Sequence, residues 1–450
     1  MTPSAVVVWF RRDLRLADHP ALQAAADEAR TLGRSLLGLF VVEEGLLATG
    51  GPNRRAYLAR TLAALDGALD GRLVLRRGRP EAVVPQVAAE VSASTVHATG
   101  DCAPYGRRRD ARVAEALAGD DRRLVRTGSP YAVSPGRVLT GDGGPYRVFT
   151  PFRRAWAAHG WPAPTDAPAG VRWAQAGREL APADLEPDAG DITATLPTAG
   201  EAAATDLSGA FLGGPFATYD EDRDRPDLAG TSRLSPHLRF GAIHPRQILD
   251  RVPAGTSGDV FRSELAWREF YADVLWHRPD SAWAPLSPVG AHLRTDTGPE
   301  ADARFAAWVA GRTGYPLVDA GMRQLSAEGW MHNRLRMLTA SFLVKDLHLP
   351  WQRGAAHFLD LLVDGDLASN NHGWQWVAGT GTDAAPFYRV FSPDRQAERL
   401  DPAGAYVARY VPEHGTPDYP APIVDHAVER AEALDRWQEA KETAARAGSA

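Results

Sequence analysis

The sequence predicts two folds in one chain: an α/β N-terminal domain with a doubly wound parallel sheet, and a mainly α-helical C-terminal domain. Short β-branched or leucine-rich runs alternate with helical patterns as far as about residue 127, and this alternation is typical of a parallel sheet with helices on both faces. From residue 206 onward, helical patterns follow one another without a convincing strand. We therefore expect an α/β domain over residues 1–127, an interdomain linker over residues 128–205 and a helical domain over residues 206–450.

The elements of the first domain follow from short apolar runs. Residues 5–10 read Ala-Val-Val-Val-Trp-Phe, which is typical of a strand buried in a parallel sheet. Pro20 follows Asp18 and His19 and opens an alanine-rich helix, since proline is favoured at the first helical position. The expected strands are residues 5–10, 36–42, 73–75, 95–98 and 123–126, and the further helices are residues 53–70, 81–90 and 107–117.

The turn after the first strand does not carry the dinucleotide-binding fingerprint. It reads Phe10-Arg11-Arg12-Asp13 in place of Gly-x-Gly-x-x-Gly. Ligands of such sheets bind at the carboxyl ends of the strands, where Arg11, Arg12 and Asp101 should lie. A ligand-binding role and plain solvated loop charges are equally open for these three residues.

Composition limits the class of protein. The chain has 450 residues and a net charge of −6, and its basic residues are arginines except Lys345 and Lys441. A slightly acidic total does not exclude nucleic acid, because a local arginine patch suffices for binding. Cys102 is the single cysteine, which excludes an internal disulfide or a thiolate metal cage. With no secretory leader and no apolar run of about 20 residues, we expect a cytoplasmic protein without a metal site or membrane span.

Residues 364–393 are the densest candidate for a binding site. Carboxylates, amides and hydroxyls lie here beside two tryptophans, and a buried polar cluster is costly unless each group finds a partner. A large heteroaromatic ligand would supply such partners. An irregular loop rich in Asn and Gly is the alternative, but it does not account for the tryptophans. The groups concerned are Asp364, Asp366, Ser369, Asn370, Asn371, Trp374, Trp376 and Thr382.

A second candidate lies at residues 231–236, which read Thr-Ser-Arg-Leu-Ser-Pro. We expect Ser235 to cap a helix whose first residue is Pro236. Hydroxyls, backbone N–H groups and Arg233 would then face the positive end of that helix, which suits a phosphate group. A plainly capped helix is the alternative for this stretch alone.

Helical spacing groups further candidates. Glu264, Trp267 and Arg268 share one helix face, where they could hydrogen-bond, stack on and orient a flat polar ligand; a surface ion pair beside a tryptophan is the alternative. Asn333 and Met337 share a face of the helix expected over residues 331–347. Arg336 on that helix could pair with Asp364 or Asp366.

Five segments in this order resemble the photolyase/cryptochrome family: residues 9–15, 230–235, 267–271, 330–337 and 364–393. The match is nearest to the class I photolyases that repair cyclobutane pyrimidine dimers in DNA. The resemblance implies an antenna domain over residues 1–127 and a helical FAD-binding catalytic domain over residues 206–450. It also implies light-driven electron transfer from reduced, anionic FAD to a dimer flipped out of UV-damaged DNA.

The resemblance also implies roles for single residues. Asn370 falls beside the flavin N5, where a carboxylate about 4 Å away would oppose an anionic flavin by roughly 4 kcal/mol at an effective dielectric of about 20. The implied FAD contacts are Tyr219, Thr231, Ser232, Arg233, Leu234, Ser235, Arg268, Arg336, Asp364, Asp366 and Asn370. The implied catalytic groups around the dimer are Glu264, Trp267, Asn333, Met337 and Trp376, and the implied DNA-phosphate contacts are Arg223, Arg334 and Arg389.

Departures from the family pattern concern the electron relay and the antenna. Trp374 and Trp351 match two members of the family's tryptophan relay, but Gly298 stands at the third position. His372 replaces a common glycine and is expected to be structural. The run Arg107-Arg108-Arg109 replaces an acidic group of folate-binding members. An 8-hydroxy-5-deazaflavin antenna, or an empty site, is therefore expected before folate.

Three other functions remain open alongside repair of cyclobutane dimers. A cryptochrome-type blue-light receptor would signal without repairing DNA, and a flavin electron-transfer protein would not need the arginines. Repair of the (6-4) photoproduct usually requires a histidine pair where Met331, Asn333 and Met337 lie. The repair reading predicts a monomer that acts on UV-damaged DNA without an obligate protein partner.

Overall fold

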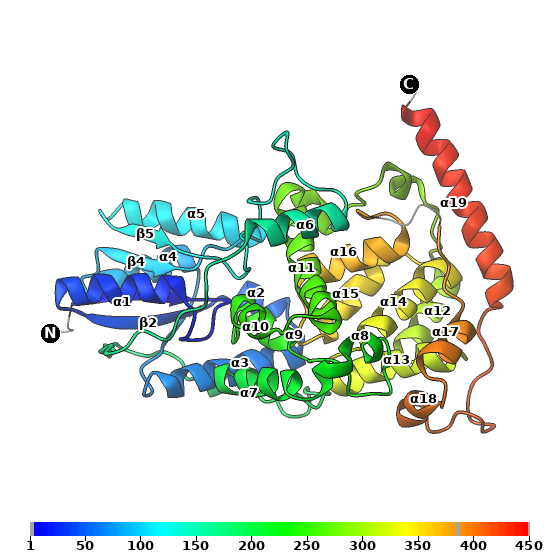
Figure 1. Cartoon of the computed structure of the whole chain (residues 1–450), viewed down its shortest axis with the longest axis horizontal. Helices are drawn as coiled ribbons and strands as arrows, with labels where there is room; N and C mark the ends of the chain where they lie inside the picture. The colour runs from blue at the N-terminus through cyan, green and yellow to red at the C-terminus, as the bar shows by residue number, and fades with distance from the viewer. Residues whose placement is uncertain (1–3, 384–387, 449–450) are drawn as a thin grey trace.

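The computed structural model describes residues 4–383 and 388–448. An α/β half and a helical half lie side by side, with the C-terminal helix at the end far from the sheet (Figure 1). Within the described residues the sheet has five parallel strands in the order β3-β2-β1-β4-β5, so the expected doubly wound sheet is confirmed. The strands are β1 (Ala5–Phe10), β2 (Ser35–Val42), β3 (Val74–Arg77), β4 (Thr95–Ala98) and β5 (Arg123–Arg126).

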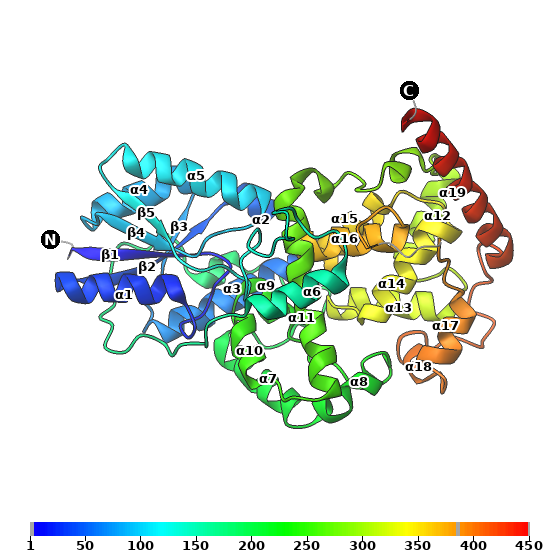
Figure 2. The ribbon, with the colours of Figure 1, turned by 45° about the horizontal axis from the view of Figure 1, so that its top comes forward.

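The central strand β1 is buried along its whole length because helices cover both faces of the sheet. Alternate side chains point to opposite faces, so Val8 packs into one apolar cluster and Trp9 into another. Figure 2 shows the two helical layers on either side of the strands. They are α1 (Pro20–Leu32) and α3 (Pro52–Ala68) on one face, and α4 (Pro80–Glu90) and α5 (Pro104–Ala118) on the other.

Local signals set the boundaries of these elements. Helix α1 begins where expected: the His19 side chain accepts the Leu22 N–H at 3.1 Å, and Pro20 is the first helical residue. The helix ends at Gly33, whose φ of 63° is the left-handed conformation that glycine adopts without strain. Strand β3 lies slightly later than the predicted residues 73–75, since a three-residue apolar run leaves the register open.

Residues 128–205 are not a bare connection. They contain α6 (Phe149–His159) and the short η1 (Pro182–Leu185). Ala174 donates its N–H to Leu36 O at 2.6 Å, and Trp173 forms an isolated parallel bridge with Leu36 of β2. The apolar face of α6, made by Phe149, Phe152 and Trp156, packs into the helical half. A spacing of three and four residues between these aromatics is the helical signal in this stretch.

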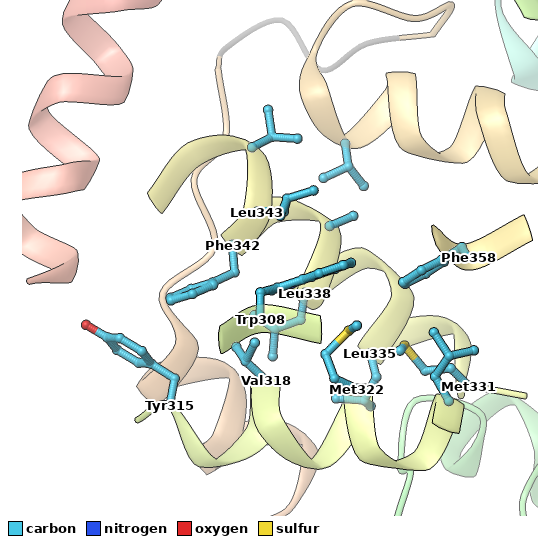
Figure 3. Packing of buried hydrophobic residues seen from close by; sticks show 14 of the residues in the cluster. Trp308, Tyr315, Val318, Met322, Met331, Leu335, Leu338, Phe342, Leu343 and Phe358 are labelled. Carbon is cyan, nitrogen blue, oxygen red and sulfur yellow. The ribbon is translucent and has the colours of Figure 1, made fainter. Parts of the chain in front are cut away.

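The second half is helical throughout, as expected. Its helices surround an apolar core that includes Trp308, Leu335 and Phe358 (Figure 3). None of the helices in the described part of the chain is long and apolar enough to cross a bilayer. Helix α2 (Glu44–Ala48) lies between β2 and α3 in the α/β half. The elements of the helical half are α7 (Glu201–Leu212), η2 (Pro215–Thr218), α8 (Tyr219–Asp222), α9 (Ser235–Phe240), α10 (Pro245–Arg251), α11 (Thr256–His277), η3 (Pro279–Ala282), η4 (Pro288–His292), α12 (Pro299–Val309), α13 (Pro316–Glu328), α14 (Asn333–Ser341), η5 (Phe342–Asp346), α15 (Trp351–Leu361), α16 (Leu367–Ala378), α17 (Pro393–Leu400), α18 (Ala405–Tyr410) and α19 (His426–Gly448).

Two predicted helix boundaries are wrong. The helix expected over residues 331–347 begins only at Asn333, because the His332 side chain caps it by accepting the Arg334 N–H at 3.2 Å. At Phe342 the backbone changes to the π-helical turn η5. Ser235 is the first residue of α9, so the cap position falls on Leu234, whose side chain makes no cap hydrogen bond.

Buried charges join the two halves. Asp18 from the turn before α1 accepts two hydrogen bonds from Arg246 of the helical half, at 2.6 and 3.1 Å. His244 lies 3.1 Å from the same carboxylate, and burial lowers the pKa of His244 to about 3. Breaking such a buried pair by removing one partner is costly. The turn before α1 is therefore held directly against the helical half.

Candidate functional site

One pocket of about 560 Å³ in the helical half collects nearly all of the predicted site residues. This volume is in the ordinary range for sites that bind large ligands. Trp351 and Arg389 lie outside the lining. The predicted residues that line the pocket are Tyr219, Arg223, Thr231, Ser232, Arg233, Leu234, Ser235, Glu264, Trp267, Arg268, Asn333, Arg334, Arg336, Met337, Asp364, Asp366, Asn370, Trp374 and Trp376.

Ion pairs with two arginines mark one side of the pocket. Arg223 contacts the Glu264 carboxylate at 2.8 Å, and Arg334 contacts Asp224 at 2.6 Å. Burial works against the charge of Arg223, but the neighbouring acidic groups, Glu264 foremost with Tyr219 and Asp224, together outweigh burial and raise the Arg223 pKa. Glu264 pairs with Arg223 and not with Arg268 four residues further along its own helix. Two of the three arginines expected to meet DNA phosphates, Arg223 and Arg334, therefore already have acidic partners.

Aromatic rings line the pocket beside these ion pairs. Trp267 on α11 stacks on Phe149 of α6, with ring centroids 3.6 Å apart and planes 10° apart. Trp376 donates its indole N–H to the Asp383 carbonyl at 3.1 Å. Phe149 is buried and was not among the predicted site residues, because it lies in the stretch interpreted as a linker. The linker thus supplies the support behind a pocket ring.

Paired charges mark another part of the pocket. Arg336 donates to both carboxylate oxygens of Asp364, at 3.2 and 2.8 Å, which confirms one of the two pairings predicted for Arg336. The Asp366 carboxylate accepts the N–H groups of Ala368 and Ser369 at 3.1 and 3.2 Å and so caps α16. Helix α16 in turn carries the pocket residues Asn370, Trp374 and Trp376.

Two further arginines surround Asp366. Arg268 donates to the carbonyls of Pro130 and Leu238 and stacks on Tyr131, with its guanidinium carbon 4.5 Å from the ring centroid. Arg239 donates to the Gly365 carbonyl at 2.7 Å and was missed in the sequence. Burial, with repulsion from neighbouring arginines, lowers the pKa of Arg239 to about 9. Nothing in the sequence around the start of α9 distinguished Arg239 as a site residue.

Asn370 offers an acceptor to the pocket. Its side-chain N–H groups donate to the Ala355 carbonyl at 3.1 Å and to Asn371 Oδ1 at 2.8 Å. Both of its donors are therefore used inside the protein, and the amide oxygen is left for a ligand. Such an oxygen suits an N–H donor and repels an anion less than a carboxylate would.

Residues 231–235 line the pocket without the expected side-chain cap. Ser235 Oγ accepts the Trp330 indole N–H at 3.2 Å. Arg233 has a left-handed φ of 50°, pairs with Glu328 at 2.8 Å and lies 4.2 Å from the Trp330 ring centroid. The hydroxyls of Thr231 and Ser232 remain at the pocket surface as candidate phosphate contacts.

The predicted relay residues are placed in the helical core. The Trp374 ring lies 6.1 Å from Trp308 and 5.0 Å from Phe358, while Trp351 is buried at the start of α15. His372 contacts Ser281 Oγ and the Ala368 carbonyl, each at 2.8 Å, and burial lowers the His372 pKa to about 4. The expectation of a structural histidine is confirmed.

The charges at the carboxyl ends of the strands are not solvated, so that alternative is wrong. Arg11 pairs with Asp110 at 2.5 Å, and Arg109 contacts Asp101 at 3.1 Å and Asp110 at 2.9 Å. Both arginine side chains are 7% exposed, and both lie over the Trp9 ring. The strand ends thus hold a buried, internally compensated ion network.

The remaining predicted groups have simple outcomes. Arg107 stacks on Trp276, with 3.8 Å between the guanidinium carbon and the ring centroid, and so links α5 to α11. Lys345 donates to the Arg389 carbonyl. Residues 384–387, part of the dense stretch at 364–393, lie outside the described residues. No group of three potential ligands that could hold a metal ion occurs among residues 4–383 and 388–448.

Comparison with known proteins identifies the family. Residues 6–169 match the family model described as DNA photolyase, and residues 261–416 match the FAD binding domain of DNA photolyase. A deoxyribodipyrimidine photo-lyase of Streptomyces griseus is 43% identical over 461 residues, covering 95% of this chain and 98% of the relative.

Solved structures give the same fold over the same length. A bacterial class III photolyase from Agrobacterium tumefaciens superimposes with a TM-score of 0.89 at 35% identity, covering 98% of each chain. A Synechocystis cryptochrome superimposes with a TM-score of 0.87 at 25% identity, covering 97% of this chain and 99% of the other. The chain therefore belongs to the DNA photolyase family, and its helical half contains the FAD-binding domain of that family.

Proposed function

We propose that the protein repairs cyclobutane pyrimidine dimers in DNA with light, in keeping with its similarity to the deoxyribodipyrimidine photo-lyase of Streptomyces griseus. The observation that carries the proposal is the composition of the pocket of about 560 Å³ described above. Arg336, Asp364, Asp366 and Asn370 provide paired charges and an amide acceptor, and Trp267 and Glu264 line the same cavity. One part fits a flavin, and the other fits two fused pyrimidines extruded from the duplex.

The residues of the pocket fit FAD. Asn370 has its N–H groups committed to the protein, so its oxygen can accept from a reduced ring nitrogen. Arg12, Arg239 and Arg268 near Asp366 give that region a positive balance, which favours an anionic ligand. Thr231, Ser232 and the backbone around Ser235 are the candidate phosphate contacts. FAD, when bound, supplies the excited-state electron donor.

The chain's own groups then bind and orient the lesion. A dimer stacks and pairs poorly, so extruding it from the duplex costs less than extruding normal bases. Trp267 and Trp376 offer apolar ring faces to the extruded bases, and Met337 adds an apolar contact. Glu264 and Asn333 can hydrogen-bond the polar edges of the pyrimidines. Trp267 and Trp376 would shield the bound lesion from water during the electron transfer for which FAD is the donor.

The test is repair of a thymine-dimer oligonucleotide under blue light by the FAD-loaded, dithionite-reduced protein. Restored thymine absorbance that requires both light and reduced FAD is the expected result. A protein that holds FAD but restores no thymine would be the receptor of the alternative reading, a cryptochrome without repair activity. A purified protein that takes up no FAD would contradict both functions.

Glu264→Ala should lower the repair yield while FAD stays bound. The carboxylate lies at the pocket with one partner, Arg223, and a hydrogen bond to a charged group contributes about 1.5–3 kcal/mol, which corresponds to roughly ten- to a hundredfold. Repair yield per absorbed photon and the flavin spectrum are the two measurements. Glu264→Gln keeps the hydrogen-bonding geometry and should retain more of the yield. Loss of FAD from either variant would place Glu264 in the cofactor site instead.

Binding of damaged duplex DNA should weaken steeply as salt rises. If Arg223, Arg334 and Arg389 each neutralise one phosphate, the logarithm of affinity should fall with the logarithm of salt concentration at a slope of roughly −2.7. Arg334→Ala should reduce that slope by about 0.9. Arg353→Ala removes an arginine of similar exposure that pairs with Asp302 at 2.8 Å away from the pocket, and it should leave the slope unchanged. A flat response in the unmodified protein would contradict phosphate contacts.

The finer assignments stay predictions. We expect an 8-hydroxy-5-deazaflavin antenna or an empty antenna site in preference to folate. A visible spectrum of the purified protein would distinguish these cases. The class I assignment and the relay through Trp374 and Trp351 rest on sequence resemblance alone. A monomeric, cytoplasmic protein that needs no obligate partner fits action on chromosomal DNA.

A further inference from the structure

Arg12 lies at the carboxyl end of the central strand β1, yet its charge is directed to the pocket of the other domain. Its Nη2 lies 2.5 Å from Asp366 Oδ2, although the two residues are 354 positions apart in the chain. Asp366 lines the pocket, whereas Arg12 does not. Arg12 therefore touches the site only through a carboxylate that faces it.

The two carboxylate oxygens of Asp366 have different partners. Oδ1 accepts the N–H groups of Ala368 and Ser369 and starts α16, while Oδ2 meets Arg12. Asp366 is largely buried, with its side chain 14% exposed. Burial alone would favour its neutral form, but Arg12, Arg239 and Arg268 outweigh burial and hold the Asp366 pKa below its ordinary value. A permanent negative charge therefore lies at the pocket, and Arg12 is its direct counter-charge.

We propose that Arg12 is a positioning residue of the flavin site: through Asp366 it offsets a negative charge beside the cofactor and so favours the reduced, anionic flavin. The inference rests on the proposed binding of FAD in this pocket. A carboxylate without its counter-ion would oppose electrons arriving next to it, and this opposition is weakly screened inside a protein. The α/β domain would then shift the redox equilibrium of the flavin toward the reduced form, besides supporting the fold.

Arg11 provides a matched control. It is the neighbouring residue at the end of the same strand and makes an ion pair of the same length, 2.5 Å, with Asp110. Its side chain is 7% exposed against 21% for Arg12, so its loss should disturb the fold at least as much. Its partner Asp110 does not line the pocket. The two arginines therefore separate an effect on the flavin from an effect on stability.

The experiment is a redox titration of the FAD-loaded full-length protein and of the variants R12Q, R12K and R11Q, with thermal unfolding measured in parallel. In R12Q the ratio of reduced to oxidised FAD at a fixed potential should fall about tenfold, a decrease of about 30 mV for a two-electron couple. Asp366 stays ionised in this variant because Arg239 and Arg268 remain. R12K, which keeps the charge, should retain most of the ratio, and R11Q should match the unmodified protein.

Two results would overturn the proposal. An unchanged ratio in R12Q with a lowered unfolding temperature would make Arg12 a fold contact only, and equal shifts in R12Q and R11Q would indicate a general loss of structure. If R12Q releases FAD, R12K decides: retention of FAD with the original ratio supports the proposal, and its loss contradicts it. Failure of the unmodified protein to bind FAD would instead refute the proposed function, so the two failures are distinguishable.

Discussion

Asp364→Ala is expected to release FAD and to destabilise the helical half by about 3 kcal/mol, the lower end of the cost of breaking a buried ion pair. Asp364 is 8% exposed, and both of its oxygens accept from Arg336. Without the carboxylate, the Arg336 guanidinium keeps only its hydrogen bond to the Met331 carbonyl at 2.8 Å. An uncompensated charge would then lie at the part of the pocket proposed to hold the cofactor. Flavin absorbance after gel filtration and the unfolding temperature measure the two effects.

Asp302→Ala is the control for this change. Asp302 pairs with Arg353 at the same 2.8 Å, but its side chain is 64% exposed. Exposed pairs contribute little to stability, about 0–1 kcal/mol, so this variant should keep its FAD and nearly its full stability. Equal FAD retention and equal stability of the two variants would mean that Asp364 contributes no more to the site than an exposed ion pair does. If the Asp364→Ala protein still retained FAD, the cofactor contacts would have to be assigned to other residues of the pocket.

Trp267→Ala should lower affinity for a dimer-containing oligonucleotide by about 1–3 kcal/mol, roughly five- to 150-fold, while FAD remains bound. The Trp267 ring is fixed from behind by Phe149 at 3.6 Å, so an apolar platform is held in place before DNA arrives. A rigid ring loses little conformational freedom on binding. Fluorescence anisotropy with damaged and undamaged oligonucleotides measures the difference, which should be largest for the damaged one.

Two further substitutions limit the interpretation of that result. Trp267→Phe keeps a flat ring and should retain most of the affinity. Trp283 is 46% exposed and does not line the pocket, so Trp283→Ala should bind as the unmodified protein does. If Trp267→Ala weakened damaged and undamaged DNA equally, the ring would be a general DNA contact and not part of a lesion pocket.

Much of the fold could be predicted because its signals are local. A buried parallel strand must be apolar on both faces, and β1 reads so in the sequence. Helix α1 carries its own start and stop in His19, Pro20 and Gly33. Helix α6 was not expected, since the turn-rich residues around it hid three aromatics at helical spacing. The π-turn η5 had no local signal, because it depends on how the preceding helix packs.

The candidate site divides in the same way. Motifs in order along the chain were enough to name the residues that the pocket now brings together, from Tyr219 to Trp376. Their partners were mostly not visible. Glu264 was expected to share its helix face with Arg268, but it pairs with Arg223. Trp267 stacks on Phe149, which lies in the stretch predicted to be a linker. Sequence spacing shows which side chains share one helix, and it does not show which second element packs against them.

The sequence by itself determined the family, the parallel sheet, the helical half and the groups available for a flavin and a lesion, since these follow from residue types and short-range periodicity. Only the tertiary structure decided where the charges are compensated. The contact of Arg12 with Asp366 spans 354 positions, and the buried ion network of Arg11, Arg109 and Asp110 closes the ends of the strands. Both depend on how two domains pack. Coulomb interactions depend on distance in space and on burial, and the spacing of residues along the chain shows neither of these quantities.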